Sequence, residues 1–347
     1  MDRLIPQSTP DPLVLGRRPV LPTTKTFALV LIAICLPTAR GDEAPLVDRG
    51  IARFTPTTAE AQIAERFRLQ PASFDWQAEQ ISTISDNFQV LNVTFPSPVK
   101  TADEANNTVH CEYFRCRQPG QRPAVIVLHI LGGDFPLSRL FCNTLAQHGV
   151  HALFLKMPYY GPRRDPNSRR RMVSPDPHET VAGMTQAVLD IRYAAAWLAD
   201  RPEIDAEHLG IFGISLGGIT AALAATAEPR LKNVCLLLAG GSIGQAGWDS
   251  AEAKPLREQW IAKGGTREQF VEILSVVDPV RYSATARGKR ILMLNASDDE
   301  VIPRPCTEAL WTALGQPPIK WYSGGHYSVA WHLFGALWQV GQFFRDG

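Results

Sequence analysis

Two serines in the chain stand between glycines in the pattern Gly-x-Ser-x-Gly. Ser215 lies in the stretch "GISLG", and Ser242 lies in "GGSIG". A serine in this pattern can act as a nucleophile when a sharp turn from a strand into a helix exposes its hydroxyl group. It then needs a base to take its proton and an acid to orient that base. Because the pattern occurs twice, at least one match is a decoy, and the surrounding elements have to separate the two.

Acidic residues and a histidine follow these serines in the chain. Asp298, Asp299 and Glu300 follow the apolar run "ILMLN" after two small residues, and His326 stands in the glycine-flanked stretch "SGGHYS". Alone, the acids could form an ordinary polar turn. Their order after the serine, acid first and histidine second, favours a catalytic set. His332 is the nearest alternative base, but it lies inside an apolar helical pattern that is typical of a core or interface histidine.

Apolar runs alternate with helical patterns over most of the chain. The runs contain almost only apolar residues, as expected of parallel strands covered on both faces; they span residues 123–131, 150–158, 208–215, 233–240 and 289–296, with a shorter one at 318–324. Apolar residues at helical spacing predict helices over 137–148, 181–201, 219–227 and 328–346. Residues 88–98 and 108–117 predict two paired strands before them. This alternation predicts a doubly wound, mostly parallel α/β sheet.

The elements around the two serines differ. Ser215 ends one of the apolar runs and is followed by Leu216, Gly217, Gly218 and a helical stretch of small residues, which permits a sharp turn. Ser242 also follows an apolar run, but the residues after it, "GQAGWDS", show no helical pattern. We therefore predict that Ser215 is the nucleophile and that Ser242 belongs to a glycine-rich loop.

With these motifs, the chain from about Gln121 to its end resembles the α/β-hydrolases. Its stretches "NASDDEVIP" and "GGHYS" are similar to those of the dienelactone-hydrolase-like and acetylxylan-esterase-like branches of secreted bacterial members. A proline commonly stands four residues after the acid in this family, which selects Asp299, with Asp298 as the alternative. The resemblance implies a triad of Ser215, His326 and Asp299.

The same resemblance implies an oxyanion hole formed by the backbone N–H groups of Leu216 and Leu131. The stretch "LHILGG" departs from the usual His-Gly motif, because Ile130 stands where glycine is common. In dienelactone hydrolases proper the nucleophile is a cysteine, whereas this chain has Ser215. The implied activity is hydrolysis of carboxylic esters with short acyl groups, on small molecules or glycans, through an acyl-enzyme and without a cofactor. A serine peptidase of the same fold and a non-catalytic hydrolase-like binding protein remain the alternatives.

Residues 244–282 form a segment between two of the expected core strands. The segment carries Trp248 and Trp260 and could be a small helical insert over the pocket. The two indoles could line an acyl or alcohol site. Packing within the insert is the alternative, since buried aromatic side chains belong more often to a core.

The overall composition limits the possible partners. The 347 residues carry a formal net charge of +1, which disfavours a general nucleic-acid surface. The one basic cluster, Arg163, Arg164 and Arg169 to Arg171, is expected to be a solvated loop, with binding of an anionic substrate as the alternative. The scattered cysteines (Cys111, Cys116, Cys142, Cys235 and Cys306) are expected to be buried thiols, and the pair His148 and His151 lacks the companions of a metal site.

The first 41 residues differ from the rest. Lys25 precedes an apolar run over 27–36, and Pro37 and the pattern Ala39-Arg40-Gly41 follow it. This is typical of a signal peptide cleaved before Asp42, with a membrane anchor as the alternative. The run is too short for a stable membrane span. We therefore expect an exported protein whose residues 42–347 form one domain, with an N-terminal extension at 42–86.

Overall fold

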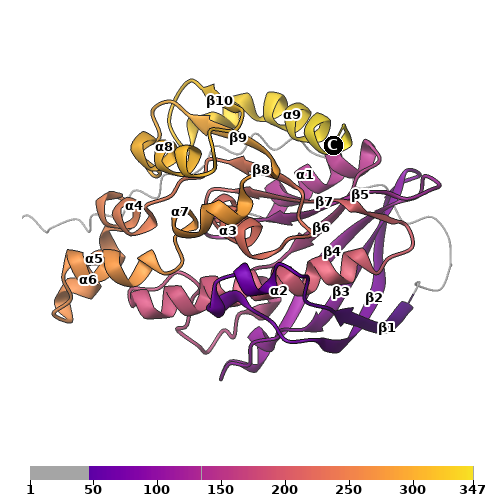
Figure 1. Cartoon of the computed structure of the whole chain (residues 1–347), viewed down its shortest axis with the longest axis horizontal. Coiled ribbons are helices and arrows are strands. Elements are labelled where there is room, and N and C mark those ends of the chain that lie inside the picture. Colours follow the sequence, from indigo (N-terminus) through magenta and orange to yellow (C-terminus); the bar gives the residue numbers. More distant parts are fainter. Residues whose placement is uncertain (1–46, 134, 347) are drawn as a thin grey trace, which may run out of the picture. The chain divides into compact units, whose positions relative to one another are not determined.

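One mixed sheet forms the centre of the protein (Figure 1). The structure is a computed structural model that describes residues 47–133 and 135–346, so the expected signal peptide at 1–41 lies outside the described residues. The sheet has the strand order β1-β2-β3-β4-β6-β5-β7-β8-β9-β10. The strands are β1 (Val47–Phe54), β2 (Ala72–Ser85), β3 (Phe88–Pro96), β4 (Thr108–Cys116), β5 (Arg122–Leu128), β6 (His151–Leu155), β7 (Ile204–Ile214), β8 (Asn233–Leu237), β9 (Arg290–Ala296) and β10 (Ile319–Tyr322).

The strands from β6 to β10 along this order are parallel, and those from β1 to β4 are antiparallel. The parallel strands β5, β6 and β8 are buried along almost their whole length, which explains their runs of Val, Ile and Leu. The predicted mostly parallel α/β sheet is therefore confirmed. Residues 47–86, expected as an N-terminal extension, contribute β1 and β2, which pair with each other and extend the sheet beyond β3.

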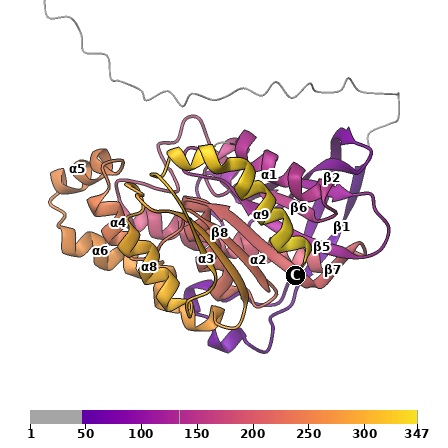
Figure 2. The same cartoon turned by 90° about the horizontal axis from the view of Figure 1, so that it is seen from above.

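Helices cover both faces of the sheet (Figure 2). Helices α1 and α9 pack on one face, and α2, α3 and α8 pack on the other, so the sheet separates two apolar cores. Within the described residues no helix is both long and apolar enough to cross a bilayer. The helices are α1 (Phe135–Gln147), α2 (Pro177–Ala199), α3 (Leu216–Ala227), α4 (Ile243–Asp249), α5 (Lys254–Ala262), α6 (Arg267–Ser275), α7 (Pro279–Tyr282), α8 (Arg304–Ala313) and α9 (Leu333–Arg345).

Helices α4 to α7 occupy the segment between β8 and β9 where an insert at 244–282 was expected. Trp248 packs edge-on against Phe270 of α6, with 5.5 Å between the ring centroids. The Trp260 indole N–H donates to the carbonyl of Thr266 over 2.9 Å. Both tryptophans therefore make contacts inside the insert. The predicted buried thiols are confirmed, because all five cysteines after residue 47 are buried and free.

The expectation of a solvated arginine loop is wrong for Arg163. This side chain is fully buried, and its guanidinium forms an ion pair of 2.8 Å with the equally buried Asp190 of α2. It also donates to the carbonyls of Lys156 and Asn106. Burial raises the pKa of Asp190, while the charge of Arg163 opposes that rise. The arginine therefore fastens the loop after β6 to α2, a partner that lies beyond the range of local sequence patterns.

Removing the carboxylate of this pair should leave a buried, unpaired guanidinium. We expect Asp190→Asn to lower the free energy of unfolding by about 3–5 kcal/mol. Urea unfolding followed by far-UV circular dichroism measures it. The matched control is Glu308→Gln, whose carboxylate pairs with Arg304 on an exposed helix surface and should cost about 0–1 kcal/mol. Similar small losses in both variants would contradict this account.

Candidate active site

Ser215 sits at the turn between β7 and α3. Its backbone has φ 54° and ψ −116°, a conformation that L-residues rarely adopt and that typically costs about 1–3 kcal/mol. Two hydrogen bonds hold it: the Ser215 N–H donates to Leu237 of β8 over 2.8 Å, and the Ser215 carbonyl accepts from Ile219 over 2.9 Å. The strained turn places the side chain at the N-terminus of α3, as the sequence pattern predicts.

Two glycines make this turn possible. A Cβ atom on Gly213 would lie 2.1 Å from the carbonyl oxygen of Gly217. A Cβ atom on Gly217 would lie 2.6 Å from the carbonyl oxygen of His129, just beyond the end of β5. Both separations are far shorter than van der Waals contact, so no larger residue fits at either position. The first turn of α3 therefore lies directly against the chain leaving β5.

His326 and Asp299 meet Ser215 at the carboxyl end of the parallel strands. The Ser215 hydroxyl lies 3.0 Å from His326 Nε2, and His326 Nδ1 lies 2.8 Å and 3.0 Å from the two carboxylate oxygens of Asp299. All three side chains are buried to more than nine-tenths. The backbone N–H of His326 donates to Glu300 over 2.9 Å, which anchors the loop that carries the imidazole. The structure thus brings the predicted serine, histidine and acid into one hydrogen-bonded row.

The geometry separates the two candidate acids. One oxygen of Asp299 accepts from the backbone N–H groups of Val301 and Ile302, at 2.9 Å and 2.7 Å, so the carboxylate is held in place while it faces His326. The Asp298 carboxylate instead accepts from the hydroxyl of its neighbour Ser297. Asp299, not Asp298, is the aspartate that contacts the imidazole.

Ser242 and His332, the alternatives to the nucleophile and the base, lie outside this row of residues. The prediction that no helix follows Ser242 is wrong, because α4 starts at Ile243. The N–H of Ile243 donates to Asp278, whose carboxylate also caps α7, and this long-range cap is invisible in the local sequence. The His332 ring stacks on the ring of Tyr322 and hydrogen-bonds to Ser323, not to Ser215.

The first oxyanion candidate, Leu216, is the opening residue of α3, where backbone N–H groups have no partner inside the helix and the helix dipole favours negative charge. The second, Leu131, lies in the loop between β5 and α1 with its side chain half exposed. The close approach of Gly217 to His129 brings this loop beside the start of α3. The two candidates therefore belong to neighbouring segments.

His129 braces the loop that carries Leu131. Its Nδ1 lies 2.8 Å from the carbonyl of Ile130 and must donate, while its Nε2 accepts from the N–H of Met157 over 3.1 Å. These partners require a neutral imidazole, and burial lowers the pKa of His129 to about 4. The Ile130 carbonyl and the Leu131 N–H belong to one planar trans peptide, so fixing the first orients the second. Sequence reasoning did not single out this histidine; its signal is a lone His at the end of a buried strand.

The helical insert reaches the catalytic loop through Tyr327, the residue after His326. Burial, a hydrogen bond with Glu252 and the charges of Glu252, Glu300 and Asp299 raise the pKa of Tyr327 to about 12. Glu252 lies between α4 and α5. The tyrosine therefore remains protonated at neutral pH and links the histidine loop to the insert, a contact that the sequence did not reveal.

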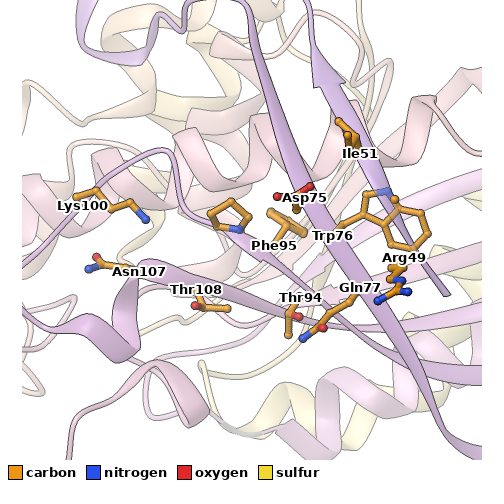
Figure 3. Close-up of a pocket in the computed structure, with 12 residues that line it drawn as sticks. Arg49, Ile51, Asp75, Trp76, Gln77, Thr94, Phe95, Lys100, Asn107 and Thr108 are labelled. Atoms are coloured by element: carbon orange, nitrogen blue, oxygen red, sulfur yellow. The ribbon is translucent and has the colours of Figure 1, made fainter. Parts of the chain in front are cut away.

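A large surface hollow lies away from this row of residues (Figure 3). It has a volume of about 520 Å³ and is lined from β1 to β4, for instance by Ile51, Asp75, Gln77 and Thr108. Strands β6 and β5 separate it from β7, a lateral distance of roughly 14 Å at the usual strand spacing. Within residues 47–133 and 135–346, no group of three His, Cys, Asp or Glu side chains is arranged to hold a metal ion.

Two protein-family models match the chain. The prolyl oligopeptidase family matches residues 184–332, and the model described as alpha/beta hydrolase domain containing 18 matches residues 75–245. Together with the sheet order and the strained serine turn, these matches decide the fold. The chain has the α/β-hydrolase fold.

Solved structures with this fold include esterases. Acetyl xylan esterase 1 from Thermoanaerobacterium sp. JW/SL YS485 superposes with a TM-score of 0.62 at 18% identity, covering 78% of this chain and 87% of that one. The acetyl xylan esterase from Paenibacillus sp. R4 gives 0.61 at 19% identity, covering 77% and 88%. A cold-adapted esterase from an Arctic intertidal metagenomic library gives 0.52 at 16% identity, covering 77% and 99%. At these identities the likeness shows the fold of this α/β-hydrolase.

Curated relatives in sequence include uncharacterized proteins from two strains of Mycobacterium tuberculosis, H37Rv and CDC 1551. Each is 28% identical to this chain over 223 residues, which cover 60% of this chain and 51% of the relative. The α/β-hydrolase described here therefore spans about half the length of the curated relatives it matches.

The neutral state of His129 has a measurable effect on stability. An unfolded histidine binds a proton below about pH 6.5, but the folded protein resists protonating His129 until about pH 4. Its contribution is therefore complete above about pH 6.5 and is lost as the pH falls towards 4. We expect His129→Gln, which does not titrate, to reduce the slope of unfolding free energy against pH in this window by up to about 1.4 kcal/mol per pH unit.

Urea unfolding at intervals between pH 4 and pH 7 measures this slope. The matched control is His178→Gln, on the exposed start of α2, which should leave the slope of the wild-type protein unchanged. A His129→Gln profile parallel to that of the wild type would show that His129 is not held neutral.

Proposed function

We propose that this α/β-hydrolase cleaves carboxylic esters through a covalent acyl-enzyme on Ser215. The observation that carries the proposal is the row of hydrogen bonds from Ser215 Oγ through the His326 imidazole to Asp299, with distances of 3.0 Å and 2.8 Å. A serine at a strained strand-to-helix turn, within hydrogen-bond distance of an imidazole nitrogen, has the arrangement that nucleophilic catalysis requires.

In the proposed reaction, Ser215 Oγ attacks the acyl carbon while its proton passes to His326 Nε2. The proton then passes to the oxygen of the leaving alcohol as the ester bond breaks, which leaves the acyl group on Ser215. A water molecule attacks this acyl-enzyme, His326 takes the proton of the water, and the acid departs as the Ser215 hydroxyl is restored. Asp299 holds the imidazole in the correct tautomer and stabilises its positive charge.

The tetrahedral intermediates carry a negative oxygen that needs hydrogen-bond donors. We assign this role to the backbone N–H groups of Leu216 and Leu131. Leu216 contributes the N-terminal dipole of α3, and His129 orients the peptide that contains the Leu131 N–H. Donors fixed in advance stabilise the developing charge without reorganising during the reaction.

The solved structures with this fold support an ester as the substrate. The solved structures that resemble this chain include acetyl xylan esterases, which favours short acyl groups on small molecules or glycans. A serine peptidase is the second candidate, because the prolyl oligopeptidase family model covers residues 184–332, which include Ser215, Asp299 and His326. We also propose, from the apolar run at residues 27–36, that the protein acts after export.

The nucleophile can be tested with the two serines of the repeated motif. We expect Ser215→Ala to lower kcat for 4-nitrophenyl acetate by at least 10³-fold, because no acyl-enzyme can form. Ser242→Ala is the matched control and should retain most of the activity, because Ser242 is not in contact with the His326 imidazole. Stopped-flow or steady-state absorbance gives both rates. Retained turnover in the Ser215 variant would refute the proposed mechanism.

The acyl preference can be tested with aryl esters of increasing chain length. We expect kcat/KM to be highest for acetyl and butyryl esters and to fall for chains of about ten carbons. Each methylene of the acyl chain that stays in water forgoes about 0.8 kcal/mol of favourable transfer free energy. A prolyl peptide 4-nitroanilide serves as the peptidase probe in the same assay. Activity rising steadily to long chains would contradict the short-acyl assignment, and cleavage of the anilide without ester turnover would favour the peptidase.

A further inference from the structure

Tyr160, in the segment after β6, lies against the loop between β5 and α1. Its ring packs edge-on against the His129 imidazole, with 4.4 Å between the ring centroids. A Cβ atom on Gly133 would lie 3.1 Å from Cδ1 of the same ring, so the ring also lies close to the backbone of the loop. Burial raises the pKa of Tyr160, and a hydrogen bond from the backbone N–H of Gly132 to the phenol oxygen opposes that rise. One side chain therefore contacts three of the residues around Leu131.

Residues 130–133 form a tight turn in which Leu131 is the second residue. The N–H of Gly133 donates to the carbonyl of Ile130 over 3.1 Å, and Gly132 has φ 89°. A glycine with this φ at the third position is typical of a type II turn. Types I and II differ mainly by a rotation of about 180° of the central peptide, which here joins Leu131 to Gly132. The carbonyl and the N–H of that peptide exchange sides in such a rotation.

Side chains hold both of the peptides that flank Leu131. His129 Nδ1 donates to the Ile130 carbonyl, which belongs to the peptide before Leu131. The Tyr160 oxygen accepts from the Gly132 N–H, which belongs to the peptide after it. A peptide dipole that is fixed in one direction stabilises a nearby developing charge better than a dipole that can reverse. The contact with Tyr160 therefore bears on the proposed oxyanion hole.

Hydrogen bonds hold the backbone of Tyr160 in place. Its N–H donates to the carbonyl of Met157 over 3.2 Å, and its carbonyl accepts from the N–H of Arg163 over 3.1 Å. The N–H of Met157 in turn donates to His129 Nε2. The Arg163 side chain is the buried ion-pair partner of Asp190 on α2. The ring of Tyr160 therefore extends from a backbone that is anchored to α2, so it can support the neighbouring loop.

We propose that Tyr160 is a positioning residue for the oxyanion hole, because its phenol oxygen holds the peptide between Leu131 and Gly132 in a single orientation. The catalytic part of this inference rests on the proposed function, whereas the hold on the peptide is a property of the folded chain. Loss of the oxygen lets the peptide rotate. Stabilisation of the tetrahedral intermediate then falls, while binding of the uncharged ester is unchanged.

The activity test removes the oxygen and keeps the ring. We expect Tyr160→Phe to lower kcat for 4-nitrophenyl acetate about tenfold with KM unchanged, as for an interaction that acts only in the transition state. Trifluoroacetophenone mimics the intermediate: Ser215 Oγ adds to its carbonyl carbon, the serine proton passes to His326, and the carbonyl oxygen becomes negative. Its inhibition constant should rise by a similar factor. Tyr193→Phe, which removes a phenol oxygen from a buried ring stacked on Phe74, is the matched control and should change neither constant.

A second substitution, Gly132→Ala, tests whether the oxygen acts through this peptide. Alanine disfavours the φ of 89° that the turn needs, although its Cβ atom would meet no atom of the described residues within 4 Å beyond its chain neighbours. We expect the losses in kcat from Gly132→Ala and Tyr160→Phe to overlap, so that the double variant is no slower than the slower single variant. Losses that multiply would overturn the proposal, because Tyr160 would then act elsewhere.

Hydrogen exchange of the Gly132 amide in isotope-labelled protein measures the hold itself without a substrate. We expect this amide to exchange about fivefold faster in Tyr160→Phe than in the wild type, and at the wild-type rate in Tyr193→Phe. A wild-type protein that neither turned over esters nor bound the ketone would sink only the proposed function, and the exchange rate would then decide the role of Tyr160. Unchanged exchange would overturn the proposal. So would a raised KM at unchanged kcat, which would make Tyr160 a substrate contact.

Discussion

The contact between the first turn of α3 and the end of β5 is the constraint on which the rest of the site depends. It requires glycine at 217, because a Cβ atom there would lie 2.6 Å from the His129 carbonyl, and glycine at 213, where the turn folds back on itself. The contact leaves Ser215 strained, aligns the N–H groups of α3 with the loop after β5, and puts the hydroxyl within reach of His326. Burial of two apolar cores on either side of the sheet supplies the stability that maintains such a strained turn.

Local patterns predicted most of this architecture because the strands that matter are buried on both faces. Their apolar runs are distinct from the helical spacing of α2 and α9, and their order along the chain put a serine, an acid and a histidine at the ends of β7, β9 and β10. The structure then brings Ser215, Asp299 and His326 together at hydrogen-bond distances. The choice of Asp299 over Asp298 came from a family pattern. Two backbone N–H donors give it a physical cause, because they fix the first carboxylate in front of the imidazole.

What local patterns missed depends on partners far away in the chain. Helix α4 begins after Ser242 because Asp278 accepts the N–H of Ile243 across 35 residues, although two glycines weaken the helical signal. Arg163 looked like part of a charged loop, and Asp190 of α2 draws it into the interior. His129 was not singled out from the sequence, yet its two ring nitrogens join the chain after β6 to the peptide before Leu131. In each case a side chain forms a hydrogen bond with a backbone group, or an ion pair with a charged side chain, that only the tertiary fold brings close to it.

These distant partners also explain how the chemistry could be separated from the choice of substrate. The sheet and buried hydrogen bonds hold Ser215, Asp299 and the peptide that His129 braces. The positions of these groups therefore depend little on the residues of the insert. Tyr327 is the exception, because its hydroxyl is shared with Glu252 of the insert while its backbone continues from His326. The same loop continues into the short helix Ser328–His332 and then into α9. A change in the insert would therefore alter what reaches the imidazole without disturbing the hydrogen bonds that position it, which is the arrangement expected where one rigid core serves many substrates.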